Sequence, residues 1–457
     1  MKLSMFLSYA CVFVFCATFF QGCFSAAPER QNNRRKQPKA GPSTAVFPVG
    51  GGIYPDGHFY ARVNIGQPPK PYYLDIDTGS DLTWVQCDAP CVNCPKGPHS
   101  PYKPRNNVMQ CKDPFCAFIT HHPNFPCHNP SDQCDYVIEY ADHGSSTGVL
   151  VKDNVPIQLT NGSVLYPALF FGCGYDQDIQ GSSHPPFLDG VLGLANGKSS
   201  ILSQLHDIGV VRNVAGHCFS HNGGGYLFLG DDLVPSSGIV WAPMLQNSHE
   251  KYYSLGPAEL FFAGKNVAKG GLSFVLDSGS TYSYFNKQAY QATITMIKKH
   301  VDIKQLKDAP EDKTLPVCWK GAVPFKSVSD VEELFNTISL RFKKAKNVMM
   351  DIAPQAYLII SNYGNVCLGI LDGSEVELGD LNVLGDISML DKLVVYDNEK
   401  QRIGWISANC DRLANTDPDY KEASNSNISR EKLYVTPDYS VVLSMLEDCY
   451  EVDIFSP

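Results

Sequence analysis

One short motif occurs twice in this chain, and each copy is followed at a similar distance by the same second element. Asp77-Thr-Gly-Ser80 in the first half is matched by Asp277-Ser-Gly-Ser280 in the second half. The second element is Val-Leu-Gly, which ends at Gly193, 116 residues after Asp77, and at Gly385, 108 residues after Asp277. Two unrelated turns rarely share both a local motif and a partner at such a distance. The repeat therefore predicts two homologous lobes, each carrying one Asp-Thr/Ser-Gly loop.

The composition and the spacing of apolar residues favour a mainly β chain. Of the 457 residues, 44% are hydrophobic and 18% are charged, which is the balance of a globular protein with large cores. Short apolar or alternating runs are separated by Gly, Pro and Asn, as is typical of strands and turns. The expected strands include 58–65, 72–76, 136–140, 226–229 and 393–396. Helical spacing is confined to about 199–208, 287–300 and 328–339.

The net charge argues against a nucleic-acid partner. The chain has 37 Lys and Arg against 47 Asp and Glu, which is a formal net charge of −10. Binding to nucleic acid relies on basic side chains that neutralise phosphates. We therefore expect no nucleic-acid partner.

Residues 1–27 have the pattern of a secretory signal peptide. An apolar run covers 3–20, and the small residues at 25–27 offer a cleavage site. A signal anchor is the alternative, because the run is long and the basic residues 34–36 lie beyond it. If the signal is cleaved, we expect no stable membrane span and a place in the secretory pathway. The destination would be extracellular (apoplastic) or the vacuolar lumen.

The segments that flank the expected lobes are polar. Residues 28–52 are predicted to be a short basic leader, which could act as an inhibitory propiece or as a solvated linker. Residues 412–457 form a polar tail that we expect to be flexible. Between these segments, the repeat places the N-terminal lobe at 53–245 and the C-terminal lobe at 246–411.

Cysteine usage agrees with an oxidising compartment. Three of the 16 Cys lie within residues 1–27, which leaves thirteen. Cys91-x-x-Cys94 could form half of a zinc site, but no second pair follows at the required spacing, so we expect no metal or other cofactor. Disulfides are favoured instead, and Cys449 in the tail is the expected unpaired cysteine. The remaining cysteines would form six bridges: Cys87, Cys91, Cys94, Cys111, Cys116, Cys127, Cys134, Cys173, Cys218, Cys318, Cys367 and Cys410.

Two sequons could carry N-linked glycans in the same compartment. They are Asn161-Gly-Ser in the first half and Asn427-Ile-Ser in the tail. A sequon permits glycosylation only where it is accessible, so both asparagines are candidates.

The two loops could perform peptide hydrolysis if the lobes bring Asp77 and Asp277 together. Two carboxyls within hydrogen-bond reach cannot both ionise readily, so the pair shares one proton in acid. The ionised carboxylate can then activate a water as general base, while the protonated carboxyl hydrogen-bonds the scissile carbonyl. Six neighbours would allow the tight turns and supply hydroxyls that brace the loops or cap the turns: Thr78, Gly79, Ser80, Ser278, Gly279 and Ser280.

These paired motifs resemble those of the pepsin-like aspartic proteases, most closely the plant nepenthesin- and nucellin-like group. The resemblance covers roughly residues 57–410. It implies a mainly β, bilobal fold, with two β lobes related by a pseudo-twofold axis and a central cleft. It also implies an aspartic endopeptidase with an acid optimum, whose partners are protein or peptide substrates and pepstatin-type inhibitors. We expect a monomer.

The resemblance also suggests roles for some cysteines. The Cys-rich segment 87–134 resembles the insertion of the nepenthesin group. Cys173 and Cys410 resemble a bridging pair of that group, and Cys318 would then pair with Cys367.

The same likeness places a substrate-covering flap at 136–150. Tyr140 occupies the position of the flap tyrosine, and Trp84 would lie behind it, able to hydrogen-bond its hydroxyl. The chain departs from the family pattern at the next residue, where Ala141 replaces the usual Gly, and the segment is one residue longer around His143. Alternatively, Tyr140 is an ordinary aromatic residue of a strand. His143 is expected to be a solvated loop residue.

Two other functions deserve comparison with the protease. Asp75-Ile-Asp-Thr78 also resembles the Asp-x-Asp-x-Thr loop of haloacid-dehalogenase-type phosphatases, with the threonine one position early. In such a phosphatase Asp75 would be the nucleophile, and Asp386 and Asp391 would help to bind Mg²⁺. That interpretation requires a parallel sheet alternating with helices, which this strand-rich sequence lacks. The second alternative is a catalytically weak or inactive pepsin-fold protein that binds or inhibits another protein.

Overall fold

The computed structural model describes the chain from Ser43 to Asp411. Within this range, residues 92, 120–126, 142, 179–187, 246–250, 302–304 and 347 are not described. The expected signal, most of the leader, the tail, Asn427 and Cys449 therefore lie outside the described residues. In the described part of the chain, no helix is both long and apolar enough to cross a membrane.

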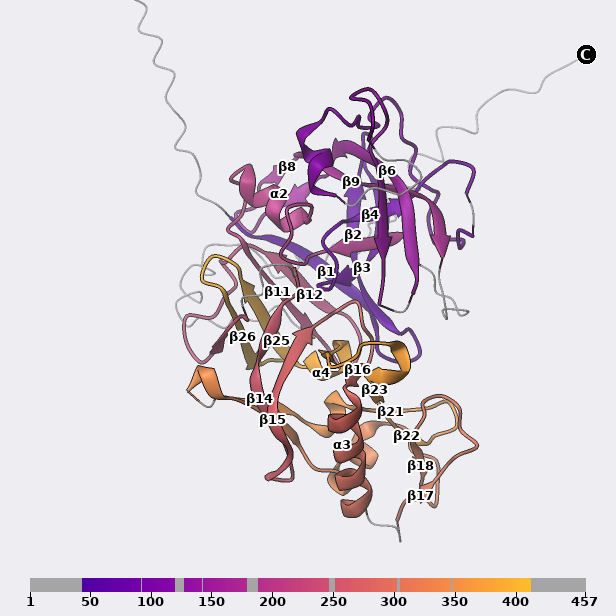
Figure 1. Ribbon diagram of the computed structural model, residues 1–457, viewed down its shortest axis with the longest axis vertical. Coiled ribbons are helices and arrows are strands. Elements are labelled where there is room, and N and C mark those ends of the chain that lie inside the picture. Colours follow the sequence, from indigo (N-terminus) through magenta and orange to yellow (C-terminus); the bar gives the residue numbers. More distant parts are fainter. Residues whose placement is uncertain are drawn as a thin grey trace, which may run out of the picture. The chain divides into compact units, whose positions relative to one another are not determined.

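Strands dominate the structure, as the sequence predicts, and the largest sheet holds thirteen of them (Figure 1). Their order is β13-β26-β25-β11-β12-β1-β2-β3-β10-β4-β9-β6-β5. Their bounds are β1 (Ala45–Gly52), β2 (His58–Ile65), β3 (Lys70–Asp77), β4 (Trp84–Gln86), β5 (Asp135–Glu139), β6 (Ser145–Asn154), β9 (Ala168–Asp178), β10 (Gly190–Gly193), β11 (Val214–Phe219), β12 (Gly225–Leu229), β13 (Val240–Pro243), β25 (Lys392–Asp397) and β26 (Arg402–Ser407).

Three smaller sheets complete the β structure. A seven-stranded sheet has the order β20-β19-β14-β15-β24-β16-β23, a four-stranded sheet the order β17-β18-β22-β21, and β7 pairs with β8. Their bounds are β7 (Ile157–Gln158), β8 (Val164–Leu165), β14 (Ser254–Phe262), β15 (Lys265–Leu276), β16 (Ser283–Phe285), β17 (Lys307–Asp308), β18 (Cys318–Lys320), β19 (Ile338–Phe342), β20 (Val348–Ile352), β21 (Leu358–Ile360), β22 (Val366–Leu368), β23 (Ile370–Asp372) and β24 (Asn382–Leu384).

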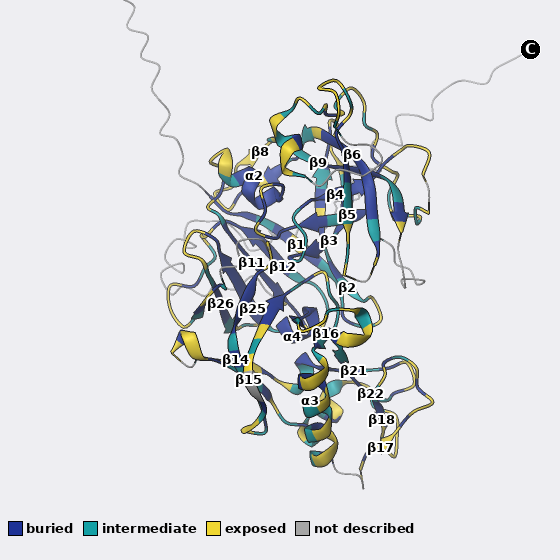
Figure 2. Cartoon of the chain, viewed as in Figure 1, coloured by how far each residue is buried: buried dark blue, intermediate teal, exposed yellow. Residues whose placement is uncertain are grey.

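Helices are few and short, and two of the three expected ones are present. Among the described residues, the α-helices are α2 (Ile201–Asp207), α3 (Lys287–His300) and α4 (Asp386–Met389). The 3₁₀ turns are Pro114–Phe118, Val328–Asp330, Glu332–Leu334, Lys343–Ala345, Pro354–Ala356 and Gly373–Val376. Asn286 caps α3 by accepting a hydrogen bond from the Ala289 N–H, and one face of the helix packs on β15 while the other is exposed (Figure 2).

The two halves of the chain repeat one strand arrangement, which confirms the homologous lobes that the motif predicts. In the first lobe β10 lies between β3 and β4, and it runs parallel to β3 and antiparallel to β4. In the second lobe β24 lies in the same way between β15 and β16. A further parallel strand follows each arrangement, β9 beside β4 and β23 beside β16. Because β3 and β15 lead into the two Asp-Thr/Ser-Gly loops, the repeated arrangement places both loops in equivalent positions.

The leader ends earlier than the expected residue 52, so that boundary is wrong. β1 pairs with β2 on one side and with β12 on the other, and it therefore lies inside the largest sheet. Ala45, Phe47 and Val49 alternate with less buried residues and pack into the main core. This period-two alternation is the signature of a strand, although Pro48 and the three following glycines obscure it in the sequence.

The helix expected at about 328–339 is also wrong. Two 3₁₀ turns cover Val328–Asp330 and Glu332–Leu334, and β19 then begins at Ile338. The apolar residues of this stretch recur every three or four positions, which suits 3₁₀ turns as well as an α-helix. From Ile338 onwards alternate residues are buried, and pairing with both β14 and β20 outweighs any helical preference.

Six disulfides connect the twelve cysteines expected to be paired. The bridge expected between Cys318 and Cys367 is present, joining β18 to β22. The other five are Cys87–Cys173, Cys91–Cys94, Cys111–Cys127, Cys116–Cys134 and Cys218–Cys410.

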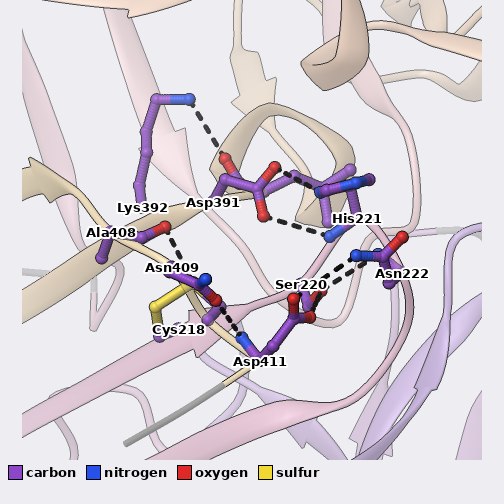
Figure 3. The surroundings of a disulfide bond; sticks show 11 residues. Cys218, Ser220, His221, Asn222, Asp391, Lys392, Ala408, Asn409 and Asp411 are labelled. Carbon is purple, nitrogen blue, oxygen red and sulfur yellow. Dashed lines mark hydrogen bonds and ion pairs between the residues drawn. A yellow bond between two sulfur atoms is a disulfide. The ribbon is translucent and has the colours of Figure 1, made fainter. Parts of the chain in front are cut away.

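The expected bridge between Cys173 and Cys410 is wrong. Cys173 on β9 lies beside the end of β4, so its partner is Cys87, the first residue after that strand. Cys410 lies just beyond β26 and bonds to Cys218 on β11 (Figure 3). Near this bridge, Ser220 donates a hydrogen bond to Asp411, so the end of the second lobe is held against β11 by both a covalent bond and a polar contact.

Candidate active site

The fold brings the two motif aspartates together at the ends of β3 and β15. The glycine of each loop lies against the carboxyl group of the other loop. A β-carbon at Gly79 would lie 2.5 Å from Oδ1 of Asp277, and one at Gly279 would lie 2.6 Å from Oδ1 of Asp77. No side chain larger than hydrogen fits at either position without displacing a carboxyl group. The reciprocal approach shows that Asp77 and Asp277 face each other about a pseudo-twofold axis.

Thr78 and Ser278 brace the two loops by an equally reciprocal set of hydrogen bonds. The Thr78 N–H donates to Oγ of Ser278 (3.1 Å), and the Ser278 N–H donates to Oγ1 of Thr78 (2.9 Å). Each hydroxyl then donates across to a main-chain carbonyl of the other lobe, Thr78 to Leu276 (3.0 Å) and Ser278 to Ile76 (2.7 Å). Both side chains are buried, so these bonds hold the loops in a fixed relation.

Each carboxyl group is also held by its own loop. Oδ1 of Asp77 accepts from the N–H groups of Gly79 (2.7 Å) and Ser80 (3.1 Å), and Oδ2 accepts from the Ser80 hydroxyl. Oδ1 of Asp277 accepts from the Gly279 N–H (3.0 Å), and Oδ2 accepts from the Ser280 hydroxyl (2.9 Å). Both serines therefore bond the carboxyls rather than merely capping the turns.

The Leu-Gly elements support the loops from behind. The Leu194 and Ala195 N–H groups donate to the carbonyls of Asp77 (2.7 Å) and Ser80 (2.9 Å). In the second lobe the Asp277 N–H donates to the Leu384 carbonyl (3.0 Å), and the Asp386 N–H donates to that of Ser280 (2.8 Å). The downstream half of the sequence repeat is thus the platform on which each aspartate loop rests.

Burial and mutual repulsion favour a shared proton on the pair. Burial and the neighbouring Asp277 carboxyl together raise the pKa of Asp77 to about 7, although the hydrogen bonds from Ser80 and Gly79 oppose the rise. Burial also raises the pKa of Asp277, although the hydrogen bonds from Ser280 and Gly279 oppose that rise. Asp77 is almost fully buried, whereas Asp277 is partly exposed and Gly279 is exposed. The pair is therefore open to solvent on one side and holds a proton through the mildly acidic range.

Two further carboxyl groups lie beside the pair, and the sequence motifs did not single them out for a role in the protease. Asp386, the first residue of α4, is 1% exposed, and neither of its carboxyl oxygens has a hydrogen-bond partner. Asp75 lies two residues before Asp77 on β3, and its Oδ1 is buried without a partner. Burial raises the pKa of both groups well above the ordinary value, and the charges of Asp77 and Asp277 raise them further. The position of Asp75 beside the pair could have been predicted from its two-residue spacing from Asp77, which puts both side chains on one face of a strand.

The segment 136–150, to which the resemblance assigns a flap, includes most of a β-hairpin. β5 and β6 form a hairpin, and Tyr140 follows β5 directly. Nε1 of Trp84 donates a hydrogen bond to the Tyr140 hydroxyl over 2.7 Å. Burial raises the pKa of the Tyr140 phenol, and the nearby Asp77 raises it further, so the hydroxyl stays protonated beside the aspartate pair.

His143, at the tip of the flap, makes a contact that the expectation of a solvated loop residue did not include. Its backbone has a positive φ of 67°, and its N–H donates to the Tyr140 carbonyl (3.0 Å). Nε2 lies 3.7 Å from Oε2 of Glu377 in the second lobe, and both side chains are more than half exposed. The flap tip of one lobe therefore contacts the other lobe through a surface ion pair that exists when the histidine is protonated.

The remaining predicted site residues lie away from the aspartate pair. Asn161 is exposed in the turn between β7 and β8, where its side chain accepts from the Ser163 N–H (2.9 Å). The phosphatase alternative fails because β3 pairs antiparallel with β2 and the sheet does not alternate with helices. Its third acid, Asp391, instead pairs with His221 at the surface (Figure 3).

Comparison with known proteins identifies the family. Two family models, described as xylanase inhibitor N-terminal and xylanase inhibitor C-terminal, match residues 59–231 and 256–407. An aspartic proteinase of Oryza sativa subsp. japonica is 44% identical over 382 residues, which cover 81% of this chain and 92% of the rice protein. The chain belongs to the pepsin-like aspartic protease family. Within this family, aspartic proteinase nepenthesin-2 of Nepenthes gracilis is 24% identical over 400 residues, or 83% of each chain.

Solved structures of the pepsin-like fold agree with this membership. Basic 7S globulin from soybean aligns with a TM-score of 0.63 at 16% identity, over 82% of this chain and 100% of the globulin. An aspartic proteinase from Irpex lacteus aligns with a TM-score of 0.56 at 15% identity, over 80% of this chain and 98% of its own. At such identities these likenesses show the fold alone.

Proposed function

We propose that this protein is an aspartic endopeptidase that hydrolyses peptide bonds of protein substrates in acid. The observation that carries the proposal is the reciprocal packing of Gly79 and Gly279 against the opposite carboxyl groups. This arrangement requires both aspartates, both glycines and both bracing hydroxyls, and the chain has all six. Homologues that are named aspartic proteinases support the same activity.

The geometry suggests a separate role for each of the two carboxyl groups. With one proton on the pair, the ionised carboxylate accepts a proton from a water molecule, which attacks the scissile carbonyl carbon. The protonated carboxyl donates a hydrogen bond to the carbonyl oxygen as negative charge develops there. The amine leaves after a proton is returned to its nitrogen. Asp77 and Asp277 are the catalytic residues of this scheme, and neither a covalent intermediate nor a cofactor is invoked.

The other site residues would position these groups rather than react. Ser80 and Ser280 orient the carboxyls, while Thr78 and Ser278 fix the spacing of the loops. Tyr140, oriented by Trp84, would cover bound substrate on the flap side. A peptide-like inhibitor such as pepstatin would occupy the same place.

A second candidate function is binding or inhibition of another protein without catalysis. Two observations favour it: the matching family models are described as xylanase inhibitor regions, and basic 7S globulin shares the fold. The intact aspartate pair favours the protease, because a purely binding role does not require two carboxyls held in this way.

The compartment belongs to the same proposal. We propose a secreted monomer that enters the secretory pathway through the signal at 1–27 and acts outside the cell or in the vacuole. Six disulfides and an exposed sequon at Asn161 are consistent with an oxidising lumen. Intact-mass and glycosidase analysis of the protein from a plant secretion system tests cleavage of the signal and occupancy of the sequon.

The test of the proposed function is a pH profile of proteolysis by the purified secreted protein on an unfolded protein substrate. Because the pKa of Asp77 is raised to about 7, the shared proton is present in acid and is lost as the pH rises through this value. We expect pepstatin-sensitive cleavage in acid that falls away near neutrality.

Two variants give this test its control. Asp77→Asn and Asp277→Asn keep the shape of the side chain but remove the shared-proton chemistry, so each should lower the rate by at least about 10³-fold while the circular dichroism spectrum is unchanged. Full cleavage by either variant, or no cleavage by the folded wild-type protein after removal of its leader, would point instead to the binding function.

A further inference from the structure

Asp75 lies on the same face of β3 as the catalytic residue Asp77. Tyr72, Leu74 and Ile76 on the same strand are buried in the main core, and the residues between them are less buried. Because successive side chains of a strand alternate between its two faces, Asp75 shares a face with Asp77, about 7 Å away along the strand. One residue of an extended peptide spans about 3.4 Å. A substrate side chain within two residues of the scissile bond can therefore reach Asp75.

The carboxyl group of Asp75 lacks a cationic partner in the protein. Its Oδ1 is buried and accepts no hydrogen bond. The ion pairs found in the described part of the chain involve other acids, and none includes Asp75, Asp77, Asp277 or Asp386. A hydrogen bond from the Ile76 N–H partly offsets the burial of this carboxyl. Without a cationic partner the carboxylate is still costly to keep here, since buried charges are usually paired. This cost suggests that a partner arrives from outside the chain.

The surroundings of Asp75 suit a long side chain with an apolar stem. Tyr60 on β2 lies directly opposite Asp75, and its ring stacks on Tyr73 with the centroids 4.9 Å apart. On the other side Asp75 is in register with Val191 of β10. Tyr60, Tyr73, Val191 and Asp75 are all partly exposed, so this face is not sealed by the protein. Aromatic and apolar side chains beside a carboxyl match the methylene stem and charged end of Lys or Arg.

We propose that Asp75 is a specificity-determining residue whose carboxylate binds a Lys or Arg side chain of the substrate within two residues of the scissile bond. This inference rests on the proposed endopeptidase function and names its substrate class. It departs from the apolar preference on both sides of the scissile bond that is typical of the family. The cation would neutralise one of four neighbouring acids, which are Asp75, Asp77, Asp277 and Asp386. Substrates with Lys or Arg at this position would therefore bind more tightly than those with an apolar side chain of similar shape.

The preference should depend on pH because Asp75 must be ionised to bind a cation. Titratable groups face Asp75 from every element around it except β10, which presents Val191. These groups are Asp77 and Tyr73 on β3, Tyr60 on β2, Tyr140 in the flap, Asp277 in the second loop and Asp386 on α4. Burial and the acidic neighbours raise the pKa of Asp75, so the group is neutral in strong acid. The advantage of a basic substrate therefore grows as the pH rises toward neutrality.

The experiment compares peptides that differ at one position only. Each position within two residues of the scissile bond carries in turn Lys, its uncharged near-isostere norleucine, or Glu, and kcat/KM is measured for each peptide. For wild-type protein we expect Lys to be preferred over norleucine at one position. Asp75→Asn should reduce this preference about tenfold or more, mainly through KM, because the lost interaction is already formed in the bound ground state.

A matched control separates charge from location. Asp207→Asn on α2 removes the same charge from an exposed site and should leave the Lys preference unchanged. If Asp75→Asn lowers the rate on all peptides equally, or leaves the ratio of Lys to norleucine intact, Asp75 has a structural role and the inference is wrong.

A binding assay tests the role of Asp75 independently of the proposed endopeptidase function. Affinities of the same Lys and norleucine peptides for the wild-type protein and Asp75→Asn are measured by fluorescence anisotropy. Selective loss of Lys-peptide binding without any turnover in the wild-type protein would support the role of Asp75 and overturn the protease. Suppose instead that the wild-type protein turns over substrate and Asp75→Asn leaves the Lys-to-norleucine ratios of both kcat/KM and affinity unchanged. This result would support the protease and overturn the role of Asp75.

Discussion

Gly279 of the second lobe lies against the carboxyl group of Asp77 in the first, with no space for a β-carbon between them. Gly279→Ala would place its methyl carbon 2.6 Å from Oδ1 of Asp77, so the carboxyl or the loop must move. A displacement of about 1 Å in such a site lowers rates by about 10²-fold. We expect that loss in kcat with little change in melting temperature, since Gly279 is exposed.

The control for this variant is Gly52→Ala, because a β-carbon there meets no atom closer than 3.7 Å. Gly52→Ala should retain full activity. Normal activity of Gly279→Ala would contradict the tight opposition of the two loops.

The buried carboxyl of Asp386 should make the protein less stable as the pH rises. Its pKa is raised above the unfolded value near 3.8, so the folded state binds the proton more tightly than the unfolded state does. The stabilising contribution is fully present below that value and is lost progressively at higher pH as the unfolded chain ionises. Asp386→Asn should therefore flatten the decline in melting temperature between mildly acidic and neutral pH.

The measurement is a series of thermal melts across this pH range for the wild-type protein and Asp386→Asn. Asp207→Asn serves as the exposed control and should follow the wild-type curve. Identical slopes for wild type and Asp386→Asn would show that Asp386 is already ionised in the folded state over that range, so that its pKa is not raised.

The hydrogen bond from Trp84 to Tyr140 should contribute modestly to catalysis. Trp84→Phe removes the donor, and a single hydrogen bond of this kind corresponds to about a two- to tenfold change in kcat/KM. Tyr140→Phe should have a similar effect, and the double variant should be no worse than either single one, because both remove the same bond. Additive losses in this double-mutant cycle would mean that the two residues act separately.

The contact between His143 and Glu377 should have only a small effect on substrate binding. Both side chains are more than half exposed, and surface ion pairs of this kind contribute about 0–1 kcal/mol. Glu377→Gln should therefore change KM by less than about fivefold in acid at low salt, and the change should vanish at high salt. A large, salt-insensitive effect would show that the flap contacts the second lobe through more than this pair.

Much of the architecture was predictable because it depends on local patterns. Alternating apolar residues marked the strands that became β2, β3, β5, β12 and β25, and helical spacing marked α2 and α3. β1 was missed because Pro48 and the following glycines hide an alternation that appears only once β2 and β12 flank the strand. The segment that follows Val328 was mistaken for a helix because its spacing of apolar residues suits either structure until β14 and β20 pair with β19.

That two equivalent loops exist follows from the sequence alone, since Asp77 and Asp277 stand in duplicated motifs with duplicated supports. The sequence also indicated which cysteines pair and, through the family resemblance, the bridge between Cys318 and Cys367. The other partners were not predictable, because Cys218 meets Cys410 only when strands from distant parts of the chain pair in one sheet. Three features arise only when the chain folds: the opposition of the two carboxyls, the closeness of Asp386 and, among the described residues, the absence of a cation beside Asp75. These properties depend on burial and on contacts between residues far apart in the chain, and no local pattern encodes them.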